Sequence, residues 1–344
     1  MSWVLGVDSG GSGLRIALGF TGARSATTTA TAASPDPAGI PAADVTTVAV
    51  TASDEPVRTG PAGLDTAHLL AQLLPAARTL LARAGGGPLS AVAIGAAGMA
   101  TLGDGLRAEL PAALERALGV SRLALAADAV TAYAGALGQR PGAVVAAGTG
   151  MIALGTDLTG WHRADGWGHL LGDSGGGAWI GRAGLEAALR AYDGRHGGSP
   201  ALLSRMEAVF GAPSGLPASL YPRADRPAVL ASFAPEVAAC ADGDPVAEGI
   251  LATAARHIAE AAAAACPPDG DAQVALTGGL FKLGEPLLAP LRTELSRLLP
   301  RVRTVTAAGD PLTGSLFVAA ALSTKSLRLP LDPRLLHVPT HRDG

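Results

Sequence analysis

The chain has 344 residues, of which 48% are hydrophobic and 16% charged, and its formal net charge is −3. A chain of this length exceeds one ordinary hydrophobic core, so we expect two domains, and the slightly acidic charge argues against a nucleic-acid or anionic-membrane surface. No Gly-Lys-Ser/Thr triplet is present, which excludes a P-loop.

The N-terminal part of the chain predicts three strands followed by alternating helices and strands. The first two apolar runs flank a Gly/Ser turn, which is typical of a β-hairpin. The predicted strands are residues 3–7, 14–20, 47–51, 91–94 and 123–126. The predicted helices begin near Asp65 and cover residues 105–118 and 128–138. Residues 23–43, rich in Thr, Ala, Ser and Pro, predict a flexible loop.

The same order of elements is predicted a second time. The predicted strands are residues 143–147, 151–156, a strand near Trp161, 273–276 and 302–306, and the helices include residues 245–266, 285–299 and 311–322. We place an N-terminal domain at residues 1–124 and a larger C-terminal domain, with a helical insertion, at residues 125–344. Two hairpin-led α/β domains with glycine turns facing each other favour a cleft for a ligand.

Glycine turns follow three of the apolar strands. Backbone N–H groups in such turns can approach a phosphate closely because no Cβ stands in the way. The residues concerned are Gly10, Gly11, Ser12 and Gly13 in the first turn, Gly148, Thr149 and Gly150 in the second, and Gly278 and Gly279 in the third. Asp8 precedes the first turn and is a candidate for orienting Mg²⁺ through water. Each turn taken alone also has a purely structural interpretation.

Asp128 follows the predicted strand at residues 123–126. A carboxylate at the carboxyl end of a strand can face a cleft and accept a proton from an attacking hydroxyl. The alternative is that Asp128 caps the following helix, which is the commonest reason for an aspartate in that position.

The run from Gly166 to Asp173 is the most specific segment, because it places Trp167 and His169 in a glycine-rich loop. We expect His169 to make a structural hydrogen bond rather than to act in catalysis. Asp173 either caps the helix that follows or accepts hydrogen bonds from two adjacent sugar hydroxyls.

Two further features of the sequence concern redox chemistry and location. Cys240 and Cys266 are too few and too far apart in sequence for a zinc cage or a disulfide framework, so we expect two buried thiols. No basic region precedes the first apolar run, which Asp8 interrupts, so we expect no signal peptide. Without a stretch of about 18 apolar residues free of charges or helix breakers, we expect a cytoplasmic protein that does not span a membrane.

The ordered motifs resemble those of the N-acetylglucosamine kinases and of the related ATPases that activate benzoyl-CoA and 2-hydroxyacyl-CoA reduction. Both groups belong to the sugar kinase, heat-shock chaperone and actin superfamily. The resemblance runs from Gly6 to about Leu322 and is sharpest over residues 166–182. It implies an α/β fold with two RNase H-like (actin-like ATPase) domains flanking a nucleotide cleft, with ATP and Mg²⁺ bound there, and a homodimer.

The resemblance also implies roles for individual residues. Asp8 would hold Mg²⁺ through water, Asp128 would be the catalytic base, and the three glycine turns would bind ATP, the third at its adenosine. The expected sugar-binding residues are Gly98, Asp128, Trp167, Gly168 and Asp173. Two departures concern the sugar: the usual Gly-Pro-x-x-Asn becomes Gly-Pro-Ala-Gly63-Leu64, and the usual Gly-Asp-Glu-Gly carries Ser174 in place of Glu.

These implications favour an ATP-dependent amino-sugar kinase. It would transfer the γ-phosphate of ATP to the 6-hydroxyl of N-acetylglucosamine or glucosamine, with the small-molecule sugar as its partner. Two alternatives stay open: an activator-type ATPase that couples ATP hydrolysis to electron transfer, which would need cysteines for an iron–sulfur cluster, and a non-catalytic nucleotide or sugar sensor.

Overall fold

The computed structural model describes residues 2–11, 13–22, 45–60, 63–268 and 271–339. The chain divides into two compact units. Unit 1 comprises Met1–Arg140, Leu158–Trp161 and Ala307–Gly344, and unit 2 comprises Pro141–Asp157 and His162–Thr306. The predicted loop at residues 23–43 lies outside the described residues.

Unit 1 is built on a six-stranded sheet. In spatial order its strands are β13 (Leu336–His337), β7 (Leu123–Ala127), β6 (Leu89–Ala96), β1 (Ser2–Gly10), β2 (Gly13–Thr21) and β3 (Val45–Ser53). Strand β1 pairs with β2 in antiparallel fashion and with β6 in parallel, and β6 and β7 are also parallel. A separate small hairpin is formed by β4 (Thr59–Gly60) and β5 (Gly63–Leu64).

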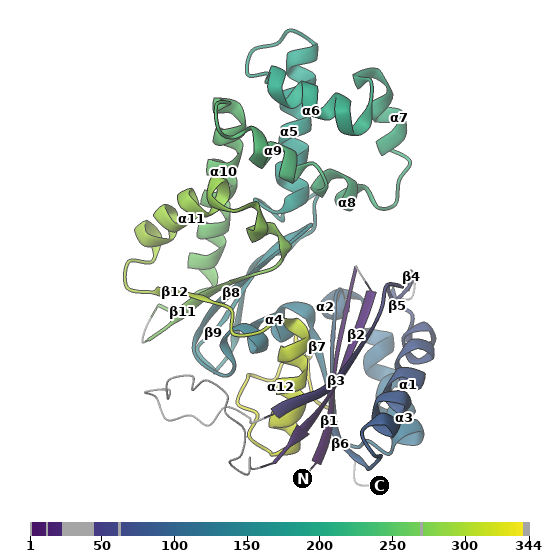
Figure 1. Ribbon diagram of the computed structural model, residues 1–344. Coiled ribbons are helices and arrows are strands. Elements are labelled where there is room, and N and C mark those ends of the chain that lie inside the picture. The colour runs from purple at the N-terminus through teal and green to yellow at the C-terminus, as the bar shows by residue number, and fades with distance from the viewer. Residues whose placement is uncertain (1, 12, 23–44, 61–62, 269–270, 340–344) are drawn as a thin grey trace. The chain divides into compact units, whose positions relative to one another are not determined.

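Helices cover both faces of this sheet, with α1 and α3 on one face and α4 and α12 on the other (Figure 1). The helices of unit 1 are α1 (Thr66–Arg83), α2 (Met99–Leu102), α3 (Asp104–Leu118), α4 (Asp128–Leu137) and α12 (Pro311–Ser323). Helix α12 lies very close to β1, because a Cβ on Gly6 would stand 2.5 Å from the backbone nitrogen of Leu316. Glycine at position 6 therefore allows the helix to pack against the strand.

Unit 2 repeats this strand order in a five-stranded sheet. The strands, in spatial order, are β10 (Trp161–Asp165), β9 (Met151–Thr156), β8 (Gly142–Ala147), β11 (Gln273–Thr277) and β12 (Arg303–Thr306). Strands β8 and β9 are antiparallel, whereas β8, β11 and β12 are mutually parallel. In each unit the first strand thus lies between its hairpin partner and a parallel strand, which is the arrangement expected of an RNase H-like domain.

The helices of unit 2 include an inserted group between β10 and β11 (Figure 1). The inserted helices are α5 (Gly177–Tyr192), α6 (Pro200–Phe210), α7 (Leu216–Leu220), α8 (Arg226–Ala231), α9 (Ala234–Cys240) and α10 (Pro245–Ala265), with the short 3₁₀ helix η1 (Pro213–Gly215). The 3₁₀ helix η2 (Gly279–Leu283) and helix α11 (Glu285–Leu298) follow β11. Phe233, Leu251 and Ile258 are fully buried and join the inserted helices to the core of the sheet. Burial of this apolar surface stabilises the insertion as part of unit 2.

The compact units follow the two sheets and not the predicted break between residues 124 and 125. Residues 125–140 lie in unit 1 because β7 pairs with β6 and leads directly into α4. The C-terminal segment also returns to unit 1, where α12 packs on β1 and β6. The predicted strands and helices themselves are confirmed, apart from end residues, whereas α2 and the β4–β5 hairpin were not predicted.

Candidate active site

The carboxyl edge of the parallel strands in unit 1 brings three predicted site residues to one place. Asp8 lies in β1 beside Gly95 of β6, which in turn lies beside Ala126 of β7. Asp128 follows two residues after Ala126, and Gly98 follows β6 in a left-handed conformation with φ of 79°. Because parallel strands end at a common edge, this edge gathers Asp8, Gly98 and Asp128.

Asp128 does not occupy the cap position of helix α4, contrary to the capping interpretation. The helix begins at Asp128 itself, and Ala127 occupies the cap position without a side-chain cap bond. The Asp128 Oδ1 atom accepts a hydrogen bond from the adjacent Ala129 N–H at 2.9 Å.

Asp128 as a whole residue is exposed to solvent, yet the protein around its carboxylate removes part of the hydration of that group. The surrounding protein removes hydration and raises its pKa to about 6, and the negative charge of Asp8 adds to the rise. A carboxyl with this pKa ionises close to neutral pH, as a general base requires.

Asp8 is held by an arginine that the sequence analysis did not single out. Arg15, its cross-strand neighbour on β2, donates to Asp8 Oδ2 from Nε at 3.0 Å and from Nη2 at 2.5 Å. Its Nη1 donates to Asp310 Oδ2 at 2.6 Å. Asp310 also caps α12 by accepting the Thr313 N–H. Burial of Asp310 tends to raise its pKa, but the hydrogen bonds from Thr313 and Arg15 outweigh this effect and hold the pKa below its usual value. Arg15 therefore connects Asp8 to the start of α12.

The first glycine turn has room beside its backbone. A Cβ on Gly10 or Gly11 would meet no atom within 4 Å. Gly13 differs, since it has a φ of 129° and a Cβ there would stand 2.0 Å from Ser53 O, so the fold requires glycine. Ser12 lies outside the described residues. Other glycines are equally unobstructed, namely Gly60, Gly160, Gly215 and Gly249. Open space therefore indicates a binding loop only where the glycine also lies at the carboxyl edge of the sheet.

The second glycine turn is pinned to the start of helix α5. The carbonyls of Gly148 and Thr149 accept hydrogen bonds from the Gly177 and Ala178 amides, each at 2.8 Å. Within the described residues, the amides of Thr149 and Gly150 have no backbone acceptor. A fixed turn with free N–H groups suits an anionic ligand.

The third glycine turn adjoins the second within unit 2. Strands β8 and β11 are parallel, so their carboxyl ends share an edge. A Cβ on Gly278 would stand 2.1 Å from the carbonyl oxygen of Ala147, and Gly278 has a φ of 109°, so glycine is required there. Gly279 has open space beside it. The structure thus brings both predicted ATP-binding turns of this unit together.

Asp173 also belongs to this edge, and it does not cap the following helix. Helix α5 has Gly176 at its cap position with no side-chain cap bond. Asp173 Oδ1 accepts from the Gly168 N–H at 2.9 Å, and a Cβ on Gly150 would lie 2.3 Å from Asp173 Oδ2. Partial burial raises the pKa of Asp173, with a further rise from the charge of Asp165. The carboxylate therefore joins the 166–173 loop to the second glycine turn.

Trp167 lies on the surface of this loop with 66% of its area exposed. The Arg163 guanidinium stacks on its ring, 4.0 Å from the centroid, which fixes the position of the indole. The predicted structural hydrogen bond of His169 is not found among the described residues. Leu170 and Leu171 beside it are 82% and 85% exposed.

The two departures at the sugar-binding motifs are now placed. Leu64 is buried with 9% exposure, and Gly63 has a φ of 100° and lies against Leu102 O. Neither residue offers a polar side chain where the resembling family has its Asn. Ser174 donates its backbone N–H to Asp165 Oδ2 at 2.9 Å.

The residues in unit 1 fit a magnesium ion that arrives with a nucleotide. Among the described residues no group of three or more His, Cys, Asp or Glu side chains could hold a metal ion by itself. Mg²⁺ is commonly bound by one or two carboxylates together with substrate phosphates. Asp8 and Asp128 provide hard oxygen donors of this kind, and Arg15 engages only the Oδ2 atom of Asp8.

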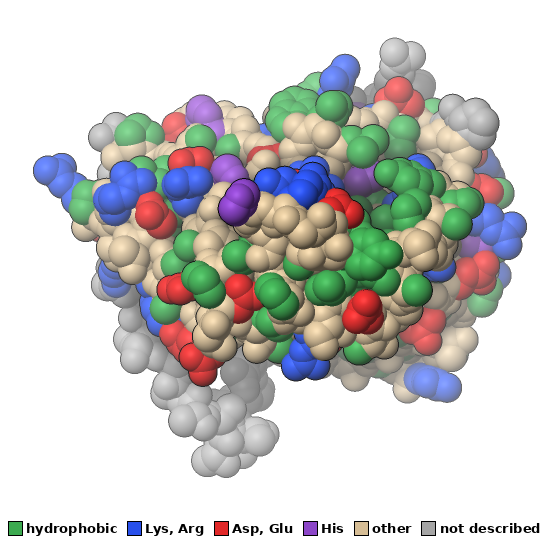
Figure 2. Space-filling model, turned by 90° about the horizontal axis from the view of Figure 1, so that it is seen from above, with side chains coloured by type: hydrophobic (Ala, Val, Ile, Leu, Met, Phe, Trp, Pro, Cys, Tyr) green, Lys and Arg blue, Asp and Glu red, His purple; other side chains and the backbone are tan. Residues whose placement is uncertain are grey.

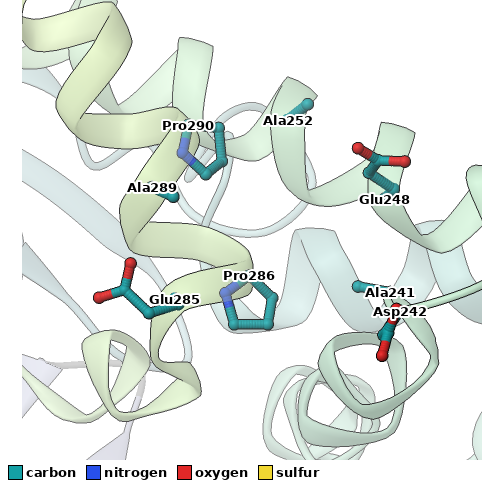
Figure 3. Close-up of a pocket in the computed structure, with 8 residues that line it drawn as sticks. All are labelled: Ala241, Asp242, Glu248, Ala252, Glu285, Pro286, Ala289 and Pro290. Carbon is teal, nitrogen blue, oxygen red and sulfur yellow. The ribbon is translucent and has the colours of Figure 1, made fainter.

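A hollow of about 290 Å³ lies elsewhere in unit 2, against helices α10 and α11 (Figure 3). Its lining residues include Asp242, Glu248 and Glu285, and none of the predicted site residues is among them. Glu285 is already paired with Arg292. On the face shown in Figure 2, basic and acidic side chains are interspersed.

Sequence reasoning missed Arg15, Asp310 and Asp165. A signal existed for Arg15, since a hairpin turned at residues 10–13 places position 15 opposite position 8. Asp310 before Pro311 carries the signature of a helix start. We find no sequence signal for the role of Asp165.

The two sheets and the residues at their carboxyl edges define an α/β protein with two RNase H-like domains, the actin-like ATPase and sugar kinase class. The chain belongs to the BadF/BadG/BcrA/BcrD ATPase family, and the match to this family covers residues 5–319. Membership of an ATPase family supports ATP as its nucleotide. In the described part of the chain, no helix combines the length and apolarity needed to cross a bilayer.

Three similar proteins carry kinase names. An N-acetylmuramic acid/N-acetylglucosamine kinase of Clostridium acetobutylicum is 40% identical over 82 residues, which span 23% of this chain and only 27% of that relative. A Chromobacterium violaceum structure provisionally named an N-acetylglucosamine kinase is 28% identical with a TM-score of 0.61, covering 93% of this chain and 99% of that one. A Porphyromonas gingivalis structure with the same provisional name is 17% identical with a TM-score of 0.63, covering 94% and 100%.

Proposed function

We propose that this protein is an ATP-dependent amino-sugar kinase that transfers the γ-phosphate of ATP to a sugar hydroxyl. The observation that carries the proposal is Asp128, whose carboxylate caps no helix and has its pKa raised to about 6. A group of this kind can accept a proton from an attacking hydroxyl near neutral pH.

In unit 1, Asp128 accepts the proton of the attacking hydroxyl. Asp8, held by Arg15, carries the negative charge that would orient Mg²⁺ through water. Bound Mg²⁺ would neutralise charge on the nucleotide phosphates. The turn at Gly10 and Gly11 has open space beside it, so its backbone amides can bind phosphate.

In unit 2, the free amides of Thr149 and Gly150 hold phosphate, and the Gly278–Gly279 turn holds the adenosine part of ATP. Asp173 accepts hydrogen bonds from sugar hydroxyls through Oδ2, since Oδ1 already accepts from Gly168. Catalysis in this class comes mainly from positioning and electrostatic stabilisation, so these groups act by holding the reactants in place.

The proposed acceptor is the 6-hydroxyl of N-acetylglucosamine or glucosamine. The kinase names of the Clostridium acetobutylicum and Chromobacterium violaceum relatives support an amino sugar. The first of these names also includes N-acetylmuramic acid, which belongs in any substrate panel. We further propose a cytoplasmic homodimer, as the resemblance implies.

A coupled assay of ADP release tests the proposal, with hexoses, hexosamines, N-acetylhexosamines and N-acetylmuramic acid as acceptors. We expect sugar-dependent and Mg²⁺-dependent turnover, with phosphate appearing on C6 of the product. Turnover of ATP at the same rate with and without every sugar would contradict a kinase. The Asp128→Asn variant serves as the matched negative control.

The activator-type ATPase is less well supported by this chain. Iron–sulfur clusters require thiolate ligands, and Cys240 and Cys266 are the two cysteines of the sequence. Cys266 is buried, which raises its thiol pKa and opposes thiolate formation, whereas Cys240 is only partly buried, contrary to the prediction. An absorption spectrum of the protein purified without oxygen would reveal a cluster if one were present.

A further inference from the structure

Asp165, the last residue of β10, ties together the two ends of the loop that carries Asp173. Its Oδ1 atom accepts the Asp173 N–H at 2.6 Å and its Oδ2 atom accepts the Ser174 N–H at 2.9 Å. The Trp167 N–H also points to Oδ1, at 3.5 Å. One carboxylate therefore bridges the start and the end of the loop.

The local backbone is shaped around this carboxylate. Asp165 and Asp173 both have left-handed φ angles, 59° and 53°, which aspartate tolerates better than most residues. A Cβ on Gly172 would lie 2.3 Å from Asp165 Oδ1, so glycine at that position lets the carboxylate enter the loop. Arg163 donates to the Asp165 carbonyl at 3.0 Å while it stacks on Trp167.

The bridge determines where Asp173 points. With its own N–H bound to Asp165 and its Oδ1 bound to Gly168, Asp173 has two anchors within one loop. Its Oδ2 atom is left beside Gly150, and no protein group among the described residues donates to this atom. Burial of Asp173 raises the pKa of its carboxyl, and repulsion from the nearby Asp165 carboxylate raises it further, so the arrangement carries an electrostatic cost.

We propose that Asp165 is a positioning residue for sugar recognition: it preforms the 166–173 loop so that the Oδ2 atom of Asp173 is presented to a sugar hydroxyl. Asp165 does not touch the sugar. This inference rests on the proposed function, because it takes a sugar hydroxyl to be the donor to the Oδ2 atom of Asp173. It predicts that the loop is ordered before any sugar binds.

Asp165→Asn is the informative variant. Asparagine keeps the size and the left-handed backbone but turns one acceptor oxygen into an N–H donor, which then faces the N–H of Asp173 or Ser174. We expect the KM for sugar to rise by about tenfold or more, the scale of a lost hydrogen bond to a charged group, while the KM for ATP stays within about twofold. Asp242→Asn, an exposed aspartate of the same unit, is the control and should change neither constant.

Amide hydrogen exchange supplies a readout that does not depend on turnover. In the sugar-free wild type, the amides of Asp173 and Ser174 should be protected, and Asp165→Asn should speed their exchange. Asp173→Ala should instead speed exchange at Gly168, because it removes the oxygen that accepts the Gly168 N–H. Unprotected amides in the sugar-free wild type would overturn the proposal without any variant.

The outcomes separate this inference from the proposed function. If Asp165→Asn speeds exchange but leaves the KM for sugar unchanged, Asp165 is only structural and the inference is wrong, whereas the kinase proposal stands. If KM for sugar and ATP rise together, the loop does not act selectively on sugar and the inference is also wrong. If the wild type phosphorylates no sugar, the kinase proposal fails and the inference fails with it, even when exchange shows the bridge.

Discussion

Replacement of Asp128 by asparagine separates stability from catalysis in a way that the structure makes quantitative. The pKa of about 6, against an ordinary 3.8, corresponds to about 3 kcal/mol at about 1.4 kcal/mol per pH unit. Because Asp128 keeps accessible surface, solvent screening reduces this to about 1 kcal/mol. Folding bears this cost whenever the carboxyl is ionised.

The sign follows from proton linkage. A carboxyl whose pKa is raised in the folded state stabilises the fold below its ordinary pKa of 3.8, and this contribution is lost as the pH rises through about 6. Asp128→Asn carries no charge at any pH, so at pH 8 it should be more stable than the wild type by about 1 kcal/mol. That is about 2–4 °C in Tm for a unit of this size, and the difference should shrink by about half at pH 5.

Catalysis should move the opposite way. Without the base, kcat should fall by about 10²–10⁴, with ATP affinity little changed. The wild-type rate should rise with pH through about 6, as Asp128 loses its proton, and this acid limb should vanish in the variant. Thermal melts at pH 5 and pH 8, with the coupled assay across pH, measure all of these. A stable variant that retains more than about a tenth of wild-type kcat would refute Asp128 as the base.

Four further predictions concern other residues of the two units. Asp8→Asn removes a negative charge that raises the pKa of Asp128, so the acid limb of the rate profile should move to lower pH, and the Mg²⁺ concentration for half-maximal rate should rise by about tenfold or more; an unchanged Mg²⁺ requirement would exclude Asp8 as the metal residue. Asp310→Asn keeps a good helix cap but breaks the ion pair to Arg15, so Tm should change by less than about 2 °C while the Mg²⁺ requirement rises. A variant with the same Mg²⁺ requirement as the wild type would show that Arg15 does not position Asp8. Gly148→Ala adds a Cβ that no protein atom obstructs, so the fold should persist while the KM for ATP rises by about tenfold, and an unchanged KM would remove the turn from the nucleotide site. Because Leu64 stands near the position of a sugar-binding Asn, preference for N-acetylglucosamine over glucosamine should be weaker than in the resembling family by about 0.5–1.5 kcal/mol, and a preference above about 1000-fold (about 4 kcal/mol) would contradict this.

Much of the fold follows from local patterns in the sequence. Apolar runs joined by glycine turns predict both hairpins, which pair as expected. Helical periodicity from Asp65 predicts α1, where Leu69, Leu73 and Leu80 are buried and Asp65 accepts the His68 N–H. These features depend on interactions between residues close in the chain, which a local pattern can record.

The sequence also placed candidate site residues near the ends of strands, but only the tertiary structure decided their partners. Asp8 is tied to Asp310, 302 positions later, through Arg15, because strand pairing and the packing of α12 bring them together. The pKa of Asp128 depends on surrounding protein and on Asp8 from another strand. Such contacts join distant segments, and no local period encodes the dielectric around a carboxylate or the donor it will meet.

Local sequence determined the strands, the helices and the glycine turns, because backbone sterics and apolar periodicity act within a few residues. Tertiary structure decided that Asp128 and Asp173 are not helix caps, and that Asp165 bridges the ends of its loop. A carboxylate has several acceptor sites, and its role depends on which N–H groups the folded chain delivers to them.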